Sequence, residues 1–221
     1  MRSVIVGAGE IGLALERVLG KNYLIDLHDP QKGIIAPPGP SEILHVCFPY
    51  TAAFVSSVIE YQTLFTPHHT VIHSTVPVGI SRHLNAIHSP IRGLHPFLSE
   101  GIETFSKFIG GDTSSEVADY FRKVGIRVVL YDKQETTEAL KLFDTEYYRV
   151  CIEFCLRVKA YCDKHSLNFH EVYTLPNMTY NEGYANLGHS EFMRPVLQPI
   201  MKEIGGHCVL PNKKLIEFSE K

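Results

Sequence analysis

The chain of 221 residues has a formal net charge of −3, with 44% hydrophobic and 20% charged residues. This composition is typical of a globular protein and excludes a disordered or fibrous chain. A general nucleic-acid binder is not expected, because such proteins present a basic face to the phosphate backbone. No apolar run approaches the roughly 18 residues that a membrane-spanning helix needs, so no membrane partner is expected either.

The cysteines and the amino end both indicate a cytoplasmic protein. Five cysteines are an odd number, and their irregular spacing favours a reducing compartment over a disulfide framework. Residues 1–7 enter a strand-like pattern at once, without the charged start, apolar middle and cleavage site of a signal peptide.

The first thirty residues contain a glycine motif in an informative context. Residues 3–6 are apolar and β-branched, as in a buried parallel strand. The segment Gly7-Ala8-Gly9-Glu10-Ile11-Gly12 follows, then a helical apolar stripe over 13–19 and a second strand over 23–28. The order of strand, glycines, helix and strand predicts a dinucleotide-binding turn.

Each glycine has a separate role in such a turn. Gly7 permits the tight turn, Gly9 lets the backbone approach a pyrophosphate, and Gly12 lets the helix pack against the strand. The amino end of the helix, at Glu10 and Ile11, offers N–H groups to the phosphates. These residues are therefore predicted to bind the cofactor.

Asp29 follows the second strand, where a carboxylate accepts hydrogen bonds from a ribose diol and repels a 2′-phosphate. This favours NAD over NADP; Asp26 is the competing acid but lies within the strand pattern. Two alternatives are a glycine-rich turn that binds nothing and a turn that binds another adenosine ligand, such as S-adenosylmethionine in a methyltransferase.

Strands and helices continue to alternate after the loop of residues 30–42. Strands are predicted at 43–48, 70–74, 91–94, 105–109 and 126–131, and helices at 51–65 and 114–124. This alternation predicts a doubly wound parallel sheet, a Rossmann-type domain over residues 1–133. Pro49 and Ser74 end the third and fourth strands and are assigned to the cofactor site together with Thr75.

Residues 134–221 are predicted to form a helical substrate and dimerisation region. Apolar residues recur every three or four positions over 135–165 without Pro or Gly, which predicts one helix of about thirty residues. The length of its apolar stripe predicts a homodimer through this helix. Cys151 and Cys155 are expected to pack in a core, so no metal site is expected. The tail from 166 is less regular.

Several segments together resemble the nucleotide-sugar dehydrogenases (the UDP-glucose/GDP-mannose dehydrogenase family), within the 6-phosphogluconate and 3-hydroxyacid dehydrogenase superfamily. They are the glycine motif, Ser-Thr-Val-Pro-Val-Gly at 74–79, Phe-Ile-Gly-Gly-Asp at 108–112, Glu-Ala-Leu-Lys at 138–141 and Gly-Gly-His-Cys at 205–208.

The resemblance implies an NAD-dependent oxidation of a sugar alcohol in two hydride steps through a thiol-bound intermediate. Cys208 matches the family's nucleophile, Lys141 the group that stabilises the oxyanion, and Thr75 a residue near the nicotinamide. A thiolate attacks an aldehyde readily, and an ammonium beside the resulting oxygen favours its negative charge.

The sequence also departs from that family. Thr145 stands where the family has Asn, Asn212 where it has Asp, and Phe97 after Pro96 where it has Glu. The family's C-terminal domain is also expected to be absent. A third hypothesis follows: a nucleotide-binding or regulatory protein that has lost catalysis.

A shorter segment, residues 93–101, resembles the His-Pro…Gly segment of prephenate dehydrogenases. The resemblance implies that His95 accepts a proton from a substrate hydroxyl, which suits a histidine near neutral pH. Two further histidines, His68 and His69, lie in a predicted turn and are expected to be solvent-exposed.

Overall fold

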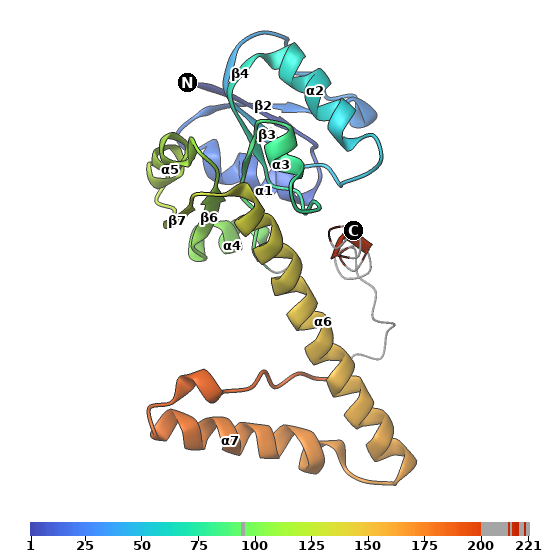
Figure 1. The fold of residues 1–221 in the computed structure, drawn as a ribbon. Coiled ribbons are helices and arrows are strands. Elements are labelled where there is room, and N and C mark those ends of the chain that lie inside the picture. The colour runs from blue at the N-terminus through green and yellow to red at the C-terminus, as the bar shows by residue number, and fades with distance from the viewer. Residues whose placement is uncertain (94–95, 200–211, 213, 217–218, 220–221) are drawn as a thin grey trace. The chain divides into compact units, whose positions relative to one another are not determined.

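The computed structural model describes residues 1–93, 96–199, 212, 214–216 and 219. It contains one sheet of seven strands in the order β2-β1-β3-β4-β5-β6-β7 (Figure 1). The strands are β1 (Arg2–Val6), β2 (Leu24–His28), β3 (Ser41–Val46), β4 (Pro67–Ile72), β5 (Ile87–His88), β6 (Lys107–Gly110) and β7 (Val128–Tyr131). Neighbouring strands are parallel, except that β5 and β6 are antiparallel. The predicted Rossmann-type sheet is confirmed.

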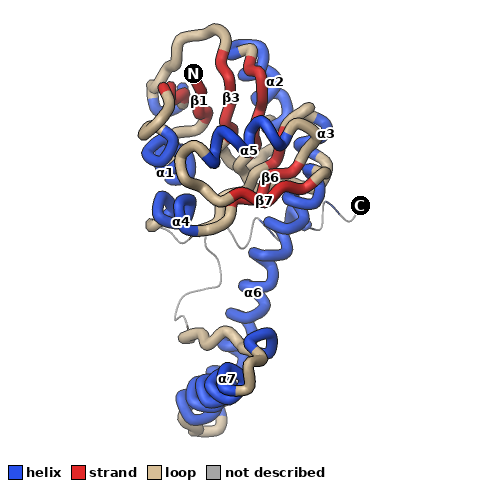
Figure 2. The backbone as a smooth tube through the Cα atoms, turned by 90° about the vertical axis from the view of Figure 1, so that its left-hand side faces the viewer, coloured by secondary structure: helices blue, strands red, loops and turns tan. Residues whose placement is uncertain are grey.

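Helices cover both faces of this sheet (Figure 2). One core joins the sheet to α1 (Glu10–Leu19), α4 (Leu98–Thr104) and α5 (Ser114–Arg122). A second core joins the opposite face to α2 (Phe54–Phe65) and the segment around α3 (Ile80–His83). Because both faces are covered, the central strands are apolar on both sides, as in Val4-Ile5-Val6, where all three residues are fully buried.

The prediction of a strand at 91–94 is wrong. The strand that occupies this place is β5, two residues long and four positions earlier in the chain. It is followed by Ser89 and Pro90, and Pro90 cannot donate a ladder hydrogen bond. Helix α4 was not predicted, because seven residues with Leu98 and Ile102 on the buried face give too short a periodic signal.

The predicted turn at His68 and His69 is also wrong. Both residues lie in β4, which starts at Pro67. His68 is exposed as expected, but His69 is only 9% exposed. The backbone of His69 pairs in register with Ile43 of β3, so His69 belongs to the sheet and not to an exposed turn.

The described residues divide into two compact units, one built from residues 1–142 and one that begins at Phe143. Helix α6 (Gln134–Lys164) begins in the first unit and continues into the second, which confirms the predicted long helix. The second unit also contains η2 (His170–Thr174), α7 (Leu175–Asn186) and η3 (Ser190–Phe192), where an irregular tail was predicted. Pro176 lies in the first turn of α7, which follows η2 directly.

Among the described residues, no helix is both long and apolar enough to cross a membrane.

Candidate functional site

The predicted cofactor residues of the first unit gather at the carboxyl edge of the sheet. The chain runs from β1 outward to β2 and then returns to β3 on the other side of β1, so the loops after β1 and β3 face each other. Open α/β sheets bind their ligands at this switch point. Here the two loops touch: a Cβ built on Gly7 would lie 3.0 Å from the backbone of Cys47 and Phe48, and Gly7 has a φ of +95°.

The other two glycines of the motif differ in what surrounds them. A Cβ on Gly12 would lie 2.0 Å from the carbonyl oxygen of Gly7, so no side chain fits where α1 crosses the turn. A Cβ on Gly9 would meet nothing within 4 Å, and the φ of Gly9 is −81°. Gly12 is therefore required by packing, whereas Gly9 borders open space that a ligand backbone can enter.

Helix α1 begins beside this open space. Its first helical hydrogen bond runs from the N–H of Leu13 to the carbonyl of Gly9, at 2.9 Å. The N–H groups of Glu10, Ile11 and Gly12 precede that bond and lie at the positive end of the helix dipole. Within the part of the chain that the structure describes, no side chain forms a capping hydrogen bond at this end of α1. Such an end is suited to a phosphate.

Asp29 is tied to the glycine turn. Its Oδ2 accepts a hydrogen bond from the N–H of Ala8 at 3.0 Å, and Nζ of Lys32 donates to the carbonyl of Ala8 at 2.6 Å. The carboxylate is where a ribose diol is expected. The ammonium of Lys32 beside it brings a positive charge to the same end of the site.

Ser74 holds the neighbouring loop in place. Its Oγ donates to the carbonyl of Phe48 at 2.6 Å, and its own carbonyl accepts a hydrogen bond from Nε2 of His88 at 3.2 Å. Pro49, next to Phe48, is exposed, and Thr75 is half-buried. The structure thus brings Pro49, Ser74 and Thr75 to the same edge as the glycine turn, and gives the Ser74 hydroxyl a positioning role.

The start of α6 is fixed to the segment that follows Thr75. Glu138 is fully buried, and its carboxylate accepts the N–H groups of Gly79 at 2.6 Å and Ser81 at 2.8 Å. Burial raises the pKa of this carboxyl above its usual value. Glu138 therefore caps α3 from another helix, and Lys141 follows one turn later on α6.

Lys141 lies within electrostatic reach of His88. Burial lowers the pKa of His88 to about 3, and the ammonium groups of Lys107 and Lys141 act in the same direction. Since Nε2 of His88 donates to a carbonyl, Nδ1 accepts from the hydroxyl of Thr137, at 2.9 Å. His88 is therefore a neutral imidazole that links the strand end at Ser74 to α6.

A second buried polar group lies under the same edge. His73 Nδ1 is 2.6 Å from the carbonyl of Ser89, and His73 Nε2 is 3.0 Å from Nδ1 of His45. Nζ of Lys107 approaches both Ser89 and His73 and lies 4.9 Å from the ring centre of Phe121. Burial lowers the pKa of Lys107 to about 7. These residues could not be predicted from the sequence, because each occurs alone within or beside an apolar strand.

Two of the predicted catalytic residues, Cys208 and His95, lie outside the described residues. Their catalytic roles remain predictions.

The sequence matches no protein-family model and no curated protein. Solved structures match its fold. The UDP-D-ManNAc dehydrogenase of Pyrococcus horikoshii superposes with a TM-score of 0.76 at 16% identity, over 97% of this chain and 63% of that one. The NDP-N-acetyl-D-galactosaminuronic acid dehydrogenase of Methanosarcina mazei has a TM-score of 0.68 at 14% identity, over 99% and 60%.

A third similar structure is the 3-hydroxyisobutyrate dehydrogenase of Mycobacterium tuberculosis, with a TM-score of 0.64 at 14% identity, over 79% of this chain and 69% of that one. The chain thus has the fold of the nucleotide-sugar dehydrogenases and spans 60–63% of the length of the two described above.

Proposed function

We propose that the chain binds NAD in the glycine turn and oxidises a CH–OH group of a sugar-derived or other hydroxylated substrate. The observation that carries this proposal is the difference between two glycines. The carbonyl of Gly7 leaves no room for a side chain at Gly12, whereas Gly9 faces open space at the amino end of α1. That is the cradle a dinucleotide pyrophosphate requires.

The residues present fit such a cofactor along its length. The N–H groups at the start of α1 would hold the diphosphate, and Asp29 would hold the adenosine ribose. Pro49 and Thr75, on the loops beyond β3 and β4, would border the nicotinamide end. When bound, the nicotinamide supplies hydride acceptance.

The choice of NAD over NADP rests on the carboxylate of Asp29. Lys32 acts in the opposite direction, because its ammonium lies beside that carboxylate and attracts a phosphate. Since Nζ of Lys32 already donates to the carbonyl of Ala8, part of its hydrogen-bonding capacity is taken up by the turn. We therefore expect NAD to bind more tightly than NADP.

Lys141 is the proposed catalytic cation. Its helix is anchored to the Thr75 segment by Glu138 and to the Ser74 carbonyl through His88. An ammonium held there would stabilise an oxyanion that forms on the substrate as its hydroxyl loses a proton. Thr75 would orient the same oxygen. Cys208 and His95 are proposed as the nucleophile and as an alternative proton acceptor.

A nucleotide-sugar is the proposed substrate class, because two of the similar structures are nucleotide-sugar dehydrogenases by name. The third oxidises a short hydroxyacid by name, which makes that class the alternative. The three structures are all dehydrogenases and give no support to a methyltransferase.

The test is reduction of NAD by a panel of UDP-sugars and short hydroxyacids, followed by NADH absorbance. We expect turnover that falls about 100-fold or more in Lys141→Met, in line with the loss of one oxyanion-stabilising group. NAD binding should be unchanged in that variant. Lys164→Met, at the exposed end of α6, is the control and should behave as the unmodified chain.

Three results would overturn the proposal. Tight NAD binding with no turnover across the panel would indicate a nucleotide-binding protein without catalysis. Binding of S-adenosylmethionine in place of NAD would indicate the methyltransferase alternative. Equal turnover in Lys141→Met would remove Lys141 from the mechanism.

A further inference from the structure

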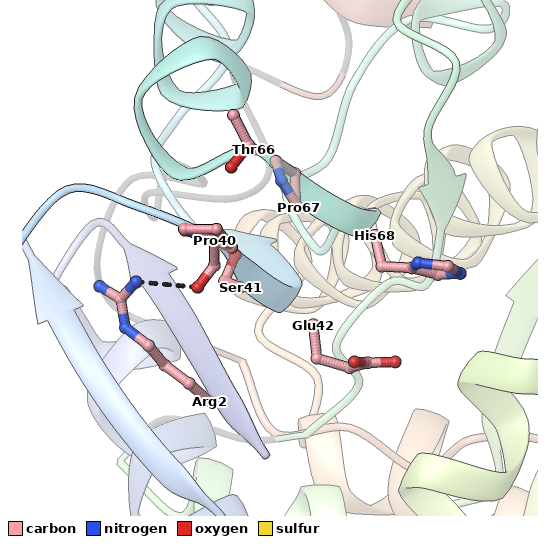
Figure 3. A pocket seen from close by; sticks show the side chains of 7 residues that line it. All are labelled: Arg2, Pro40, Ser41, Glu42, Thr66, Pro67 and His68. Atoms are coloured by element: carbon pink, nitrogen blue, oxygen red, sulfur yellow. Dashed lines mark hydrogen bonds between the residues drawn. The ribbon is translucent and has the colours of Figure 1, made fainter.

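The opposite edge of the sheet, at the amino ends of β1, β3 and β4, carries two neighbouring hollows. The larger, of about 450 Å³, is lined by residues 2, 40–42 and 66–68 (Figure 3). The smaller, of about 60 Å³, is lined by residues from β3, β4 and α5, among them Glu42, His69 and Glu116. Glu42 borders both. These hollows have no part in the proposed cofactor site, because parallel strands place their amino and carboxyl ends on opposite edges.

Three ligand-type side chains converge between the hollows. Nε2 of His69 lies 2.8 Å from Oε2 of Glu116, and Nε2 of His68 lies 3.8 Å from the same oxygen. All three ligand atoms are within 4.8 Å of one another, the one such group of three among the described residues. In a tetrahedral zinc site the metal lies about 2.0–2.1 Å from each nitrogen or oxygen, so ligand atoms at these separations need to move little to share one ion.

The three side chains are held by well-packed elements. His69 is 9% exposed and lies in β4, in register with β3. Glu116 is in the first turn of α5, next to Val117, which is fully buried in the core. His68 is exposed, and its ring lies 4.7 Å from that of His69 at an interplanar angle of 76°. His69 is therefore a fixed ligand, and the exposed side chains of His68 and Glu116 are free to adjust around it.

The surrounding charge also favours a cation. Glu42 and His68 extend in the same direction from the adjacent strands β3 and β4 (Figure 3). The small hollow is lined by three carboxylates, those of Glu42, Glu116 and Asp119, and by two cationic groups, the ammonium of Lys123 and the amino group of Met1. Carboxylates thus outnumber cationic groups around the small hollow by three to two.

We propose that His68, His69 and Glu116 form a binding site for a divalent transition-metal ion of the zinc class, which leaves one coordination position open to solvent. Two imidazoles and one carboxylate are ligands that zinc accepts, whereas calcium and magnesium require oxygen ligands. No metal site was predicted from the sequence, and His68 and His69 were predicted to lie in a solvent-exposed turn. Bound metal would join β4 to α5 and stabilise the first unit.

The experiment is calorimetric titration of Zn²⁺ into the full chain, free of any affinity tag and with thiols kept reduced, and a parallel titration of Co²⁺ followed by its visible spectrum. We expect one saturable equivalent and a four-coordinate Co²⁺ spectrum. His68→Ala and Glu116→Gln should each weaken binding at least about tenfold, as the loss of one ligand does. Both side chains are exposed, so both variants should fold.

His83→Ala is the matched control, because His83 is an exposed histidine of α3 outside the group. It should bind Zn²⁺ as the unmodified chain does. A loss of Zn²⁺ affinity in His68→Ala and Glu116→Gln, but not in His83→Ala, would also show that Zn²⁺ binds at this site and not at other imidazoles or thiols of the chain. Absence of a saturable equivalent, or equal affinity in His68→Ala, Glu116→Gln and His83→Ala, would overturn the proposal.

Discussion

Lys107 is a charged residue placed where an uncharged one would be expected. It is 5% exposed, and its nearest polar neighbours are the carbonyl of Ser89 and the ring of His73. Because Nδ1 of His73 also donates to that carbonyl, the ammonium faces another donor. No carboxylate among the described residues forms an ion pair with it. These surroundings account for the fall of its pKa to about 7.

This shift predicts a pH-dependent stability. An unfolded lysine has a pKa of about 10.4, so above pH 7 the unfolded chain binds more protons than the folded chain, and stability rises with pH. For one such group the free energy of unfolding should rise by about 2 kcal/mol from pH 6.5 to 8.5. Lys107→Met should remove this rise, which urea denaturation at the two pH values would measure.

The control for Lys107→Met is Lys133→Met, which changes an exposed lysine. It should keep the full rise in stability. Parallel pH dependence of the unmodified chain and Lys107→Met would show that the folded chain does not lower the pKa of Lys107. The lower limit of pH 6.5 avoids most of the titration of the buried His45, His73 and His88. Burial lowers the pKa values of His45 and His88 to about 3 and that of His73 well below its usual value, so these groups cause loss of stability mainly as pH falls below about 6.5.

At the scale of elements, the contact between α3 and α6 aligns the two segments that the family resemblance singled out. One segment contains Thr75 and the other Lys141, and Glu138 joins them through two backbone N–H groups. Because α3 is only four residues long, a cap from outside is a large part of what holds it.

We expect Glu138→Gln to lower the free energy of unfolding by about 1–3 kcal/mol. The amide oxygen of glutamine can replace one carboxylate oxygen as an acceptor. Its NH₂ group takes the place of the other oxygen and faces a backbone N–H group that is then left without an acceptor. Urea denaturation would measure the loss. Glu135→Gln, one turn earlier on the same helix, removes an exposed ion pair with Arg82 and should change stability much less. Equal effects of the two substitutions would contradict the capping role.

The first thirty residues could be predicted from the sequence, because the glycine turn depends on residues that are close along the chain. Gly7, Gly9 and Gly12 have the surroundings that the motif predicts. The polar contacts behind the site could not be predicted in this way. Glu138 reaches donors 57 and 59 residues away, and His88 contacts Thr137 across 49 residues. Nothing in the local pattern around these residues signals such partners.

Helix α6 illustrates the same division. Its length follows from a simple apolar repeat and was predicted. The burial of the individual apolar residues in this repeat was not predicted. Cys155 and Cys162 are buried. The aromatic residues Phe143, Tyr147 and Phe154 are 60%, 63% and 47% exposed. Among the described residues, the second unit thus buries positions in the carboxyl-terminal part of the apolar stripe, at Cys155 and Cys162, and leaves the aromatic residues exposed.

At the scale of the whole molecule, we propose that a second copy of the chain covers the exposed part of this stripe. A twofold axis across α6 would bring the same aromatic residues of two copies together, as isologous interfaces do. We expect light scattering to give twice the mass of one chain, and Tyr147→Arg combined with Phe154→Glu to give a monomer. The exposed Tyr161→Arg is the control. A single-chain mass at all working concentrations would exclude the dimer.

The central claim about the molecule is that the glycine turn holds a nicotinamide dinucleotide. Gly9→Ala tests it most directly, because the added methyl group meets no protein atom within 4 Å and the backbone needs no change. Gly183→Ala, which also adds a methyl group in open space, is the matched control. In a calorimetric titration with NAD, we predict that Gly9→Ala weakens binding about tenfold or more while Gly183→Ala binds as the unmodified chain does. Equal NAD affinity in all three proteins, or no NAD binding by the unmodified chain, would contradict the claim.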